Sequence, residues 1–186
     1  MRVSYRYIRP CSVLYARSAG VYAMSVAQAW HTMTLWLEAR DARHLVKRGI
    51  GVFHDNPTVT MPEAQRYDAC VRLGADATLD ADPEAGIGHQ TLAGGAYAVH
   101  SHMGAYEAMG ELFSNLRTEA VAKRGLSIDD GRPFVAIYLN DPMRTREMHR
   151  HTELCIPVIP IRVPLSGNDD GDLVVSAEAV PRRFQA

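Results

Sequence analysis

Two short apolar segments of the chain each carry an acidic residue and a cysteine at the same spacing. TELCIPV contains Glu153 and Cys155, and YDACV contains Asp68 and Cys70. A carboxylate on so apolar a strand is costly to bury unless it is paired or hydrogen-bonded. Glu153 is therefore the sharpest candidate for chemistry. If the Glu153 side chain is buried, it could hold a cationic ligand. If it lies at the exposed start of its strand, it reaches water and has no such role.

Aromatic residues could supply the other part of such a ligand site. Alternation puts Glu153 on one face of a sheet, and we expect Tyr138, in the strand predicted at 135–139, to share that face. Rings around a carboxylate suit flat, apolar cations, because they provide contact area and cation–π attraction. Trp30 falls on an apolar helical stripe and is expected in the core. Trp36 falls off that stripe and is expected to be exposed or turned toward the ligand.

Asp68 and the histidines are weaker candidates. Asp68 is flanked by Arg66 and Arg72, so we expect a paired or solvated aspartate. Two pairs of histidines have the i, i+2 spacing with which a strand could chelate a metal: His100 with His102, and His149 with His151. Neither pair has a third potential ligand at a spacing typical of metal sites. The sequence also has no phosphate-binding, dinucleotide-binding or G-x-S-x-G motif. The sequence therefore predicts neither a metal nor a cofactor.

These residues must be positioned by elements that recur along the chain. The segments GVFHDNP and AIYLNDP lie 85 residues apart, and the same offset separates Asp68 from Glu153. Tyr22 and Tyr106 each follow a glycine by two positions and lead into a helical pattern of apolar residues. We predict an α+β fold in which one β-α-β-β unit is duplicated in tandem, with a seam between the halves where a ligand can bind.

The duplication sets the predicted boundaries. The first repeat covers about residues 12–73 and the second about residues 96–159. Residues 74–95, rich in Gly, Ala and Asp, are predicted to be a linker over the surface. Residues 160–186 form a C-terminal extension outside the repeat, with a hairpin turn expected at 167–172.

The overall composition narrows the range of functions. The 186 residues carry 20 basic and 21 acidic side chains, a net charge of −1, which argues against a nucleic-acid-binding surface. No run of about 18 apolar residues exists to span a membrane. Arginines interrupt the first 25 residues, where a secretion signal needs an apolar run. The three cysteines are odd in number and far apart, so we expect reduced thiols in a cytoplasmic protein.

The doubled unit, the Gly-x-Tyr before each helix, the HDNP and LNDP turns and above all TELCIPV resemble the GyrI-like superfamily. This is the small-molecule-binding domain at the end of AraC-type and MerR-type multidrug regulators, also found alone. The resemblance covers roughly residues 12–158, and we expect the domain to span residues 1–159. Because the repeat starts within the first dozen residues, we expect the stand-alone form, without a DNA-binding segment.

The resemblance implies an architecture and a set of site residues. It implies an antiparallel sheet with two long helices around a groove on a pseudo-twofold axis. In that family the glutamate of the last strand is the acidic anchor for cationic, aromatic ligands, which makes Glu153 the implied anchor here. Tyr22 and Tyr106 are the implied groove residues.

Three functions are compatible with this resemblance. The leading one is a binding domain for hydrophobic, cationic aromatic small molecules, with Glu153 as anchor and Tyr138, Tyr22, Tyr106 and Trp36 around the ligand. The second is a hydrolase of reactive, cyclopropane-containing genotoxins, in which Glu153 acts as base and Tyr138 or Tyr22 as positioning hydroxyl. The third is a protein-interaction module similar to the gyrase-inhibitor branch, with a protein as partner. None of the three requires direct contact with DNA or a membrane.

Overall fold

The computed structural model describes residues 1–121 and 125–161. The hairpin turn predicted at 167–172 lies outside these residues. None of the helices in the described ranges is both long and apolar enough to cross a membrane.

Strands and helices alternate along the chain much as the sequence predicts. The first part contains β1 (Ser4–Ile8), β2 (Cys11–Ala19), α1 (Tyr22–Ala39), β3 (Val46–Phe53), β4 (Arg66–Leu73) and β5 (Ile87–Leu92). The second part contains β6 (Gly95–Met103), α2 (Met109–Val121), β7 (Leu126–Ile128), β8 (Phe134–Tyr138) and β9 (His151–Pro160). Single-turn 3-10 helices lie in the connections, at Arg43–Leu45, Pro62–Ala64, Pro83–Ala85, Tyr106–Ala108 and Glu147–His149.

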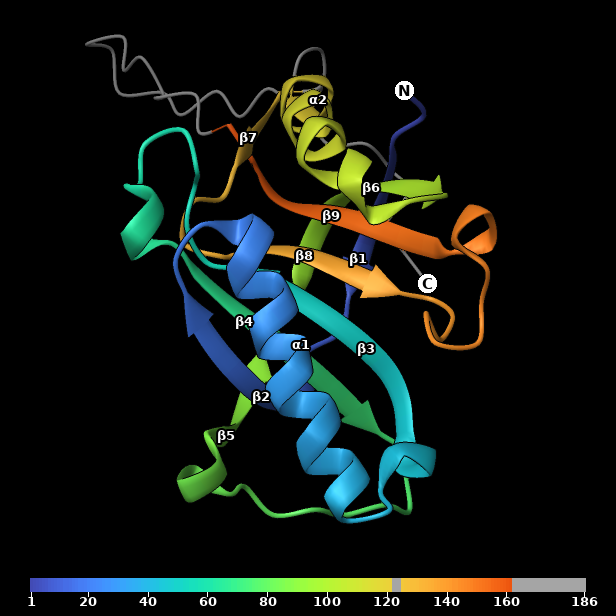
Figure 1. The fold of residues 1–186 in the computed structure, drawn as a ribbon. Helices are drawn as coiled ribbons and strands as arrows, with labels where there is room; N and C mark the ends of the chain where they lie inside the picture. Colours follow the sequence, from blue (N-terminus) through green and yellow to red (C-terminus); the bar gives the residue numbers. More distant parts are fainter. Residues whose placement is uncertain (122–124, 162–186) are drawn as a thin grey trace, which may run out of the picture.

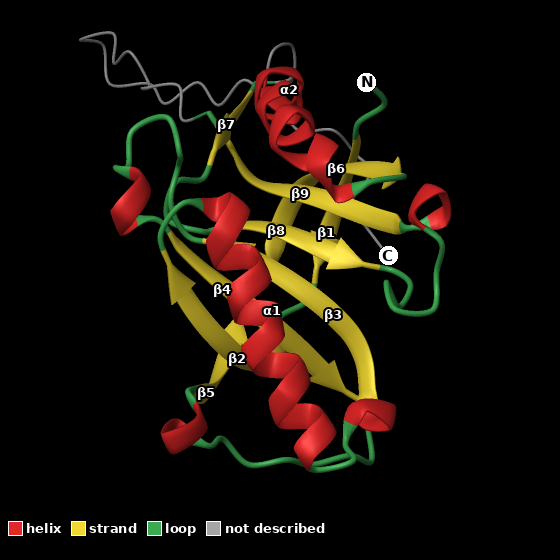
Figure 2. Ribbon diagram, viewed as in Figure 1, coloured by secondary structure: helices red, strands yellow, loops and turns green. Residues whose placement is uncertain are grey.

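The strands form an antiparallel sheet in the order β1-β6-β9-β8-β3-β4-β2-β5, with β7 paired to β9 outside this order. Both helices pack on the same side of the sheet, α1 on β2 and β4, and α2 on β9 and β6 (Figure 1). Figure 2 shows that the sheet is strongly twisted and that the two helices lie over different parts of it. The predicted α+β fold with an antiparallel sheet and two helices is confirmed. The tandem duplication stays a prediction, which superposition of the two halves will test.

Three strands lie where the sequence predicts none, and one of them is the short β7 between α2 and β8. Residues 74–95 are predicted to be a surface linker, but β5 lies within them, pairs with β2 and buries Ile87 completely. Similarly, β1 precedes the first predicted strand and pairs with β6. The sequence of β5, IGHQTL, contains a glycine and only two β-branched residues. Its strand conformation therefore depends on pairing with a neighbour already in the sheet, which a local pattern does not reveal.

The two faces of the sheet have different neighbours. Leu154 and Ile156 of β9 pack against the helices, as alternation predicts. Cys155, between them, packs on the other face with Val52 and Val99. The apolar core therefore has one part beneath the helices and another on the side of the sheet away from them.

Asp68 of β4 lies on the face away from the helices and is fully buried. Arg17 of β2 donates to its two carboxylate oxygens at 2.6 and 2.8 Å, and Gln90 of β5 donates at 2.9 Å. The His54 Nε2 atom, just after β3, lies 2.7 Å from Asp68 Oδ2. Burial raises the pKa of Asp68, but the hydrogen bonds from these three side chains outweigh it and hold the pKa below its ordinary value. Of the two outcomes that the sequence leaves open for Asp68, paired or solvated, the structure has the paired one, with Arg17 as the ionic partner rather than a flanking arginine. This pairing joins β4 to β2, β5 and the end of β3.

On the helix side, β3 has no side chain at two central positions, Gly49 and Gly51. A Cβ atom at Gly51 would lie 2.5 Å from the Tyr67 hydroxyl oxygen and 3.0 Å from that of Tyr138. A Cβ atom at Gly49 would lie 3.2 Å from the Trp30 ring. A glycine inside a strand often marks such a close approach. These two glycines provide the space in which three aromatic side chains meet above the middle of the sheet.

We expect Gly51→Ala to lower the free energy of unfolding by about 1–3 kcal/mol, the usual cost of overpacking a full core. The added methyl group must push the Tyr67 and Tyr138 hydroxyls apart. Gly110→Ala is the control, because a Cβ atom there meets nothing within 4 Å in the first turn of α2. It should leave stability unchanged or raise it by up to about 1 kcal/mol. Urea unfolding measures both, and a Gly51 variant as stable as wild type contradicts the packing argument.

We expect Asp68→Asn to lower the free energy of unfolding by about 2–3 kcal/mol at neutral pH, the scale of charge-assisted hydrogen bonds. Because the pKa of Asp68 is depressed in the folded state, this stabilisation is present above the unfolded-state value near 4 and is lost as pH falls below it. The difference between wild type and variant should therefore shrink on acidification. Denaturant titrations at several pH values measure it, with the exposed Asp76→Asn as control. A difference that does not change with pH would show that the carboxylate charge is not what stabilises.

Candidate functional site

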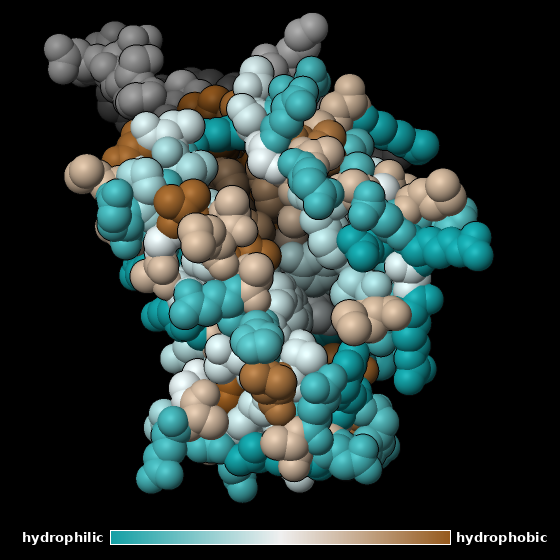
Figure 3. All heavy atoms as spheres, viewed as in Figure 1, coloured by the Kyte–Doolittle hydropathy of each residue, from teal (hydrophilic) through white to brown (hydrophobic). Residues whose placement is uncertain are grey.

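A groove of about 580 Å³ lies beside α1, between this helix, the start of α2 and the neighbouring ends of β3 and β8. We call it the α1–α2 groove. Figure 3 shows the surface hollowed between the two helices, with side chains of mixed hydropathy around the hollow. The larger apolar and aromatic residues that line it are Val26, Trp30, Met33, Leu37, Val46, Val71, Tyr106, Met109, Tyr138, Leu139, Pro142 and Met143. A groove of this volume is large enough for a drug-sized molecule.

Three aromatic side chains from three elements form the wall of the groove. The rings of Trp30 and Tyr138 meet edge to face with centroids 5.5 Å apart, and those of Tyr106 and Tyr138 do so at 5.4 Å. Trp30 Nε1 donates to the Tyr67 hydroxyl at 2.8 Å, and that hydroxyl lies 3.3 Å from the one of Tyr138. Edge-to-face pairs and hydrogen bonds together fix the ring positions. The wall is thus preformed.

The tyrosines of the wall are neutral. Burial raises the pKa of Tyr106 to about 12, and burial also raises the pKa of Tyr138. Neither hydroxyl ionises near neutral pH. The wall therefore offers ring surface and neutral hydroxyl groups to a ligand, rather than an anion.

Two of the basic residues at the groove are already engaged. Arg48 donates to the backbone carbonyl of Leu139 at 2.6 Å and to that of Tyr138 at 3.3 Å. Arg43 donates to Glu38 at 2.8 Å. Lys47, which is exposed, makes no ion pair within the described residues. Most of the positive charge around the groove is thus already directed to acceptors of the protein.

Two carboxylates at the groove have weak ionic partners or none. Glu107 is exposed and forms no ion pair with any residue in the described ranges. Asp141 accepts a hydrogen bond from the backbone of Met143 at 2.9 Å. Its ionic partner, Arg144, is 3.8 Å away with 88% of its side chain exposed, so water screens this pair. Both carboxylates can therefore accept a cation.

Glu153 does not lie in the groove, contrary to the prediction that it shares a face with Tyr138. In the β8–β9 pair Tyr138 is opposite Thr152, whereas Glu153 is opposite Ile137, so the two side chains project from opposite faces. Arg6 of β1 donates to the Glu153 carboxylate at 2.6 Å, and 18% of the glutamate side chain is exposed. Glu153 and Tyr138, one of the two residue pairs that the hydrolase alternative allows, are therefore not brought together. The anchor role of Glu153 is an untested prediction.

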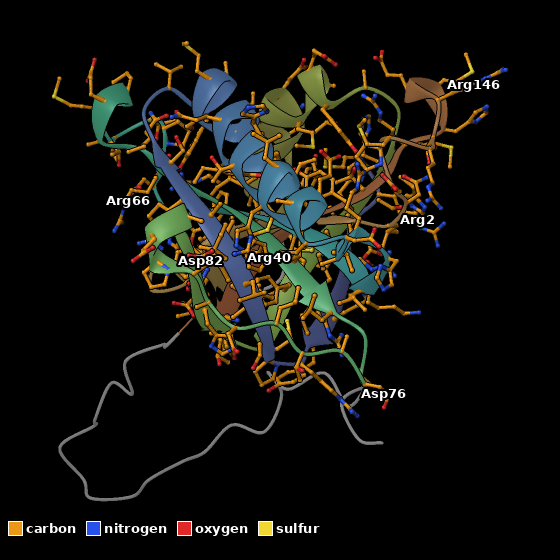
Figure 4. The ribbon with its side chains drawn as sticks, turned by 60° about the horizontal axis from the view of Figure 1, so that its bottom comes forward. Arg2, Arg40, Arg66, Asp76, Asp82 and Arg146 are labelled. Atoms are coloured by element: carbon orange, nitrogen blue, oxygen red, sulfur yellow. The ribbon has the colours of Figure 1, made fainter. Side chains whose placement is uncertain are left out.

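The predictions for the two tryptophans are wrong: Trp36, expected to be exposed or to face the ligand, is buried, and Trp30, expected in the core, lines the groove. Trp36 is buried, with 4% of its surface exposed, and its Nε1 donates to Asp82 Oδ2 at 3.0 Å. The Arg40 guanidinium lies 4.6 Å over its ring, and Figure 4 shows Arg40 beside Asp82. Trp36 is therefore a core residue beneath the 74–95 segment, and Trp30 faces the groove. The sequence signal for the position of Trp30 is the pair of glycines in β3, because a glycine inside a strand often marks the close approach of a bulky neighbour.

The two tyrosines implied by the resemblance lie in different places. Tyr106 lines the groove. Tyr22, at the start of α1, donates to the backbone carbonyl of Asp55 at 2.7 Å and meets the ring of Phe53 edge to face at 5.1 Å. Tyr22 thus fixes the loop after β3 at the other end of the β3–β8 pair.

The histidine pairs are occupied by hydrogen bonds. His151 Nε2 lies 2.6 Å from the Ser101 hydroxyl, and His102 Nε2 lies 3.0 Å from the Ala105 carbonyl. Within residues 1–121 and 125–161, no group of three His, Cys, Asp or Glu side chains has the arrangement to hold a metal ion.

Comparison with known proteins identifies the family. Residues 1–159 match the sequence profile of the GyrI-like small-molecule-binding domain. A DNA gyrase inhibitor from Cronobacter turicensis is 30% identical over 146 residues, 75% of this chain and 85% of that protein. The C-terminal domain of EcmrR has a TM-score of 0.65 at 12% identity, over 86% of this chain and 98% of that one. SAV2435 bound to tetraphenylphosphonium has a TM-score of 0.60 at 14% identity, over 86% of this chain and 94% of that one. The chain belongs to the GyrI-like small-molecule-binding family.

Proposed function

We propose that this protein binds hydrophobic aromatic cations in the α1–α2 groove. The observation that carries the proposal is the preformed wall of Trp30, Tyr106 and Tyr138 in a groove of about 580 Å³. Aromatic rings attract organic cations through cation–π interaction, and they also provide large apolar contact. A related fold, SAV2435, has been solved with such a cation, tetraphenylphosphonium.

The charges around the groove support a cationic ligand. Arg48 and Arg43 are bound to protein acceptors, so among the described residues that line the groove Glu107 and Asp141 face one base without an ion pair, Lys47. We assign the countercharge to Glu107 and Asp141 rather than to Glu153, because they line the groove. A ligand cation over the rings would then have carboxylates at the rim of the groove.

The carboxylate assignment predicts a charge-dependent loss of affinity. The double variant Glu107→Gln, Asp141→Asn should weaken tetraphenylphosphonium binding by about 1–2 kcal/mol, because exposed ion pairs contribute up to about 1 kcal/mol each. Binding of the neutral analogue triphenylphosphine oxide should change little. Isothermal titration calorimetry at low and high salt measures both, and high salt should reduce the loss.

Glu153→Gln is the matched control for this experiment, because it removes a carboxylate from the opposite face of the sheet. Its affinity for the cation should equal that of wild type. A loss of cation binding in Glu153→Gln with none in the double variant would reverse the assignment and restore Glu153 as the anchor. Equal losses for the cation and the neutral analogue would mean that the carboxylates act through shape rather than charge.

The two tyrosines provide an independent test of where the ligand lies. Tyr106→Leu should weaken binding of both the cation and its neutral analogue by about 1–2 kcal/mol, since an aromatic contact is lost in either case. Tyr22→Leu should lower stability, because its hydroxyl bonds to Asp55 are lost, but it should leave affinity unchanged. Titration of both variants below their unfolding temperature compares them. An equal effect of the two substitutions on affinity would contradict the location of the site.

A further inference from the structure

The β3–β8 pair has two ends, and each end has a hollow. The register runs from Gly49 opposite Tyr138 to Phe53 opposite Phe134. The α1–α2 groove lies at the first end. A second hollow of about 360 Å³ lies at the other end, and we call it the Phe53–Phe134 pocket. It is lined by Phe53, His54, Asp55, Asn56, Val59, Arg117, Asp130, Arg132, Pro133 and Phe134, none of which lines the groove.

The pocket has a rigid aromatic wall. Phe113 of α2 meets Phe53 edge to face with centroids 5.2 Å apart, and it stacks on Phe134 at 5.9 Å with an interplanar angle of 28°. Contact with Phe113 fixes the two rings that line the pocket. Val59 and Pro133 add apolar surface. A flat apolar group of a ligand therefore has a surface on which to pack.

Several polar groups at the pocket are fully used within the protein. Arg132 donates to Asp129 at 2.6 Å and to the backbone carbonyls of Gly94, Ala96 and Val158. The Arg66 guanidinium donates hydrogen bonds to both carboxylate oxygens of Asp55, at 2.8 and 3.0 Å. These side chains need no further partner from a ligand.

His54 is held in the same way. Its Nε2 atom lies 2.7 Å from the buried Asp68 carboxylate. The Arg17 guanidinium, which binds the same carboxylate, lies 3.4 Å from that ring nitrogen. His54 and Arg17 are therefore committed to Asp68, on the face away from the helices.

Arg117 is different, because its guanidinium has no acceptor in the part of the chain that the structure describes. It lies on α2 one turn after Phe113 and is partly buried, yet its side chain makes no hydrogen bond or ion pair with any residue of 1–121 or 125–161. Asp130, the other charged residue whose side chain has no ion pair here, is exposed to water on the turn before β8 and does not pair with it. A guanidinium beside an aromatic wall matches a carboxylate attached to a flat apolar body, since its paired N–H groups fit both carboxylate oxygens.

We propose that the Phe53–Phe134 pocket is a second ligand site, which binds a small aromatic carboxylate through Arg117. The apolar body of the ligand packs on Phe53 and Phe134, and its carboxylate lies against the guanidinium. The site prefers the opposite charge from the groove and shares no lining residue with it. Its failure would therefore leave the proposed function of the groove untouched.

The probe is 3-phenylpropionate, with 3-phenylpropanamide as its neutral counterpart. Backbone amide NMR shifts and calorimetry report the location and strength of binding. We expect saturable binding of 3-phenylpropionate that shifts the backbone amide signals of residues 53–56, Arg132 and Phe134. We expect 3-phenylpropanamide to bind at least tenfold more weakly than 3-phenylpropionate. A hydrogen bond to a charged group contributes more binding free energy than a hydrogen bond to a neutral group. Tetraphenylphosphonium should not compete.

The variants locate the charge. Arg117→Met keeps the apolar stem and should weaken carboxylate binding at least tenfold, while Arg117→Lys keeps the charge and should lose less. Arg144→Met removes an arginine that is 88% exposed in another loop and should have no effect. Thermal unfolding confirms that each variant is folded. The proposal is overturned if wild type shows no saturable binding, if the amide binds as tightly, if Arg117→Met binds like wild type, or if the shifts lie at Trp30 and Tyr106 instead.

Discussion

The absence of side chains at Gly49 and Gly51 is the constraint on which the rest of the site depends. β3 lies in the middle of the sheet, where a strand usually fills its helix-facing side with large residues. Because no Cβ atom projects at Gly51, the Tyr67 and Tyr138 hydroxyls can approach to 3.3 Å over the backbone. That contact places the acceptor for the Trp30 indole, and so connects α1 to the middle of the sheet. The fixed aromatic wall of the groove therefore depends on the two glycines of β3, whose missing side chains leave space for the rings.

The sheet separates two kinds of chemistry by alternation. On the helix side lie the rings that a ligand can reach. On the other side lie the carboxylates to which the sequence first directs attention, each bound to an arginine of an outer strand: Asp68 to Arg17 of β2, and Glu153 to Arg6 of β1. These ion pairs join strands, and β4 and β9 lie on either side of the central β3–β8 pair. The acids that line the groove come instead from the loops at its rim.

The sequence predicts the elements better than the faces. The apolar stripes of α1 and α2 and the alternation of β9 are strong periodic signals, and the structure confirms them. The prediction that Tyr138 shares a face with Glu153 is wrong, because β8 has only five residues and is apolar on both sides. Only its register with β9 decides which way the ring points. Alternation alone does not contain that information.

The two tryptophans show a second limit. A helical stripe identifies residues that face the protein, but it does not distinguish a packed core from the wall of a groove. For this reason the stripe predicts Trp30 in the core, whereas it lines the groove. Trp36 is buried because Asp82 reaches it from a segment that composition assigns to a surface linker. Both outcomes depend on contacts between residues far apart in the chain. The G-I-G of β3 was a local signal for the groove, since glycine inside a strand often marks a close approach.

The central claim is that ligands bind on the aromatic wall of the α1–α2 groove. Intermolecular NOEs between bound tetraphenylphosphonium and the assigned ring protons of the protein test it most directly. The account predicts NOEs from the phenyl groups to Trp30, Tyr106 and Tyr138, and none to side chains around Glu153. NOEs to Arg6 and Ile137, with none to the three aromatic rings, would place the ligand on the other face of the sheet and contradict the account.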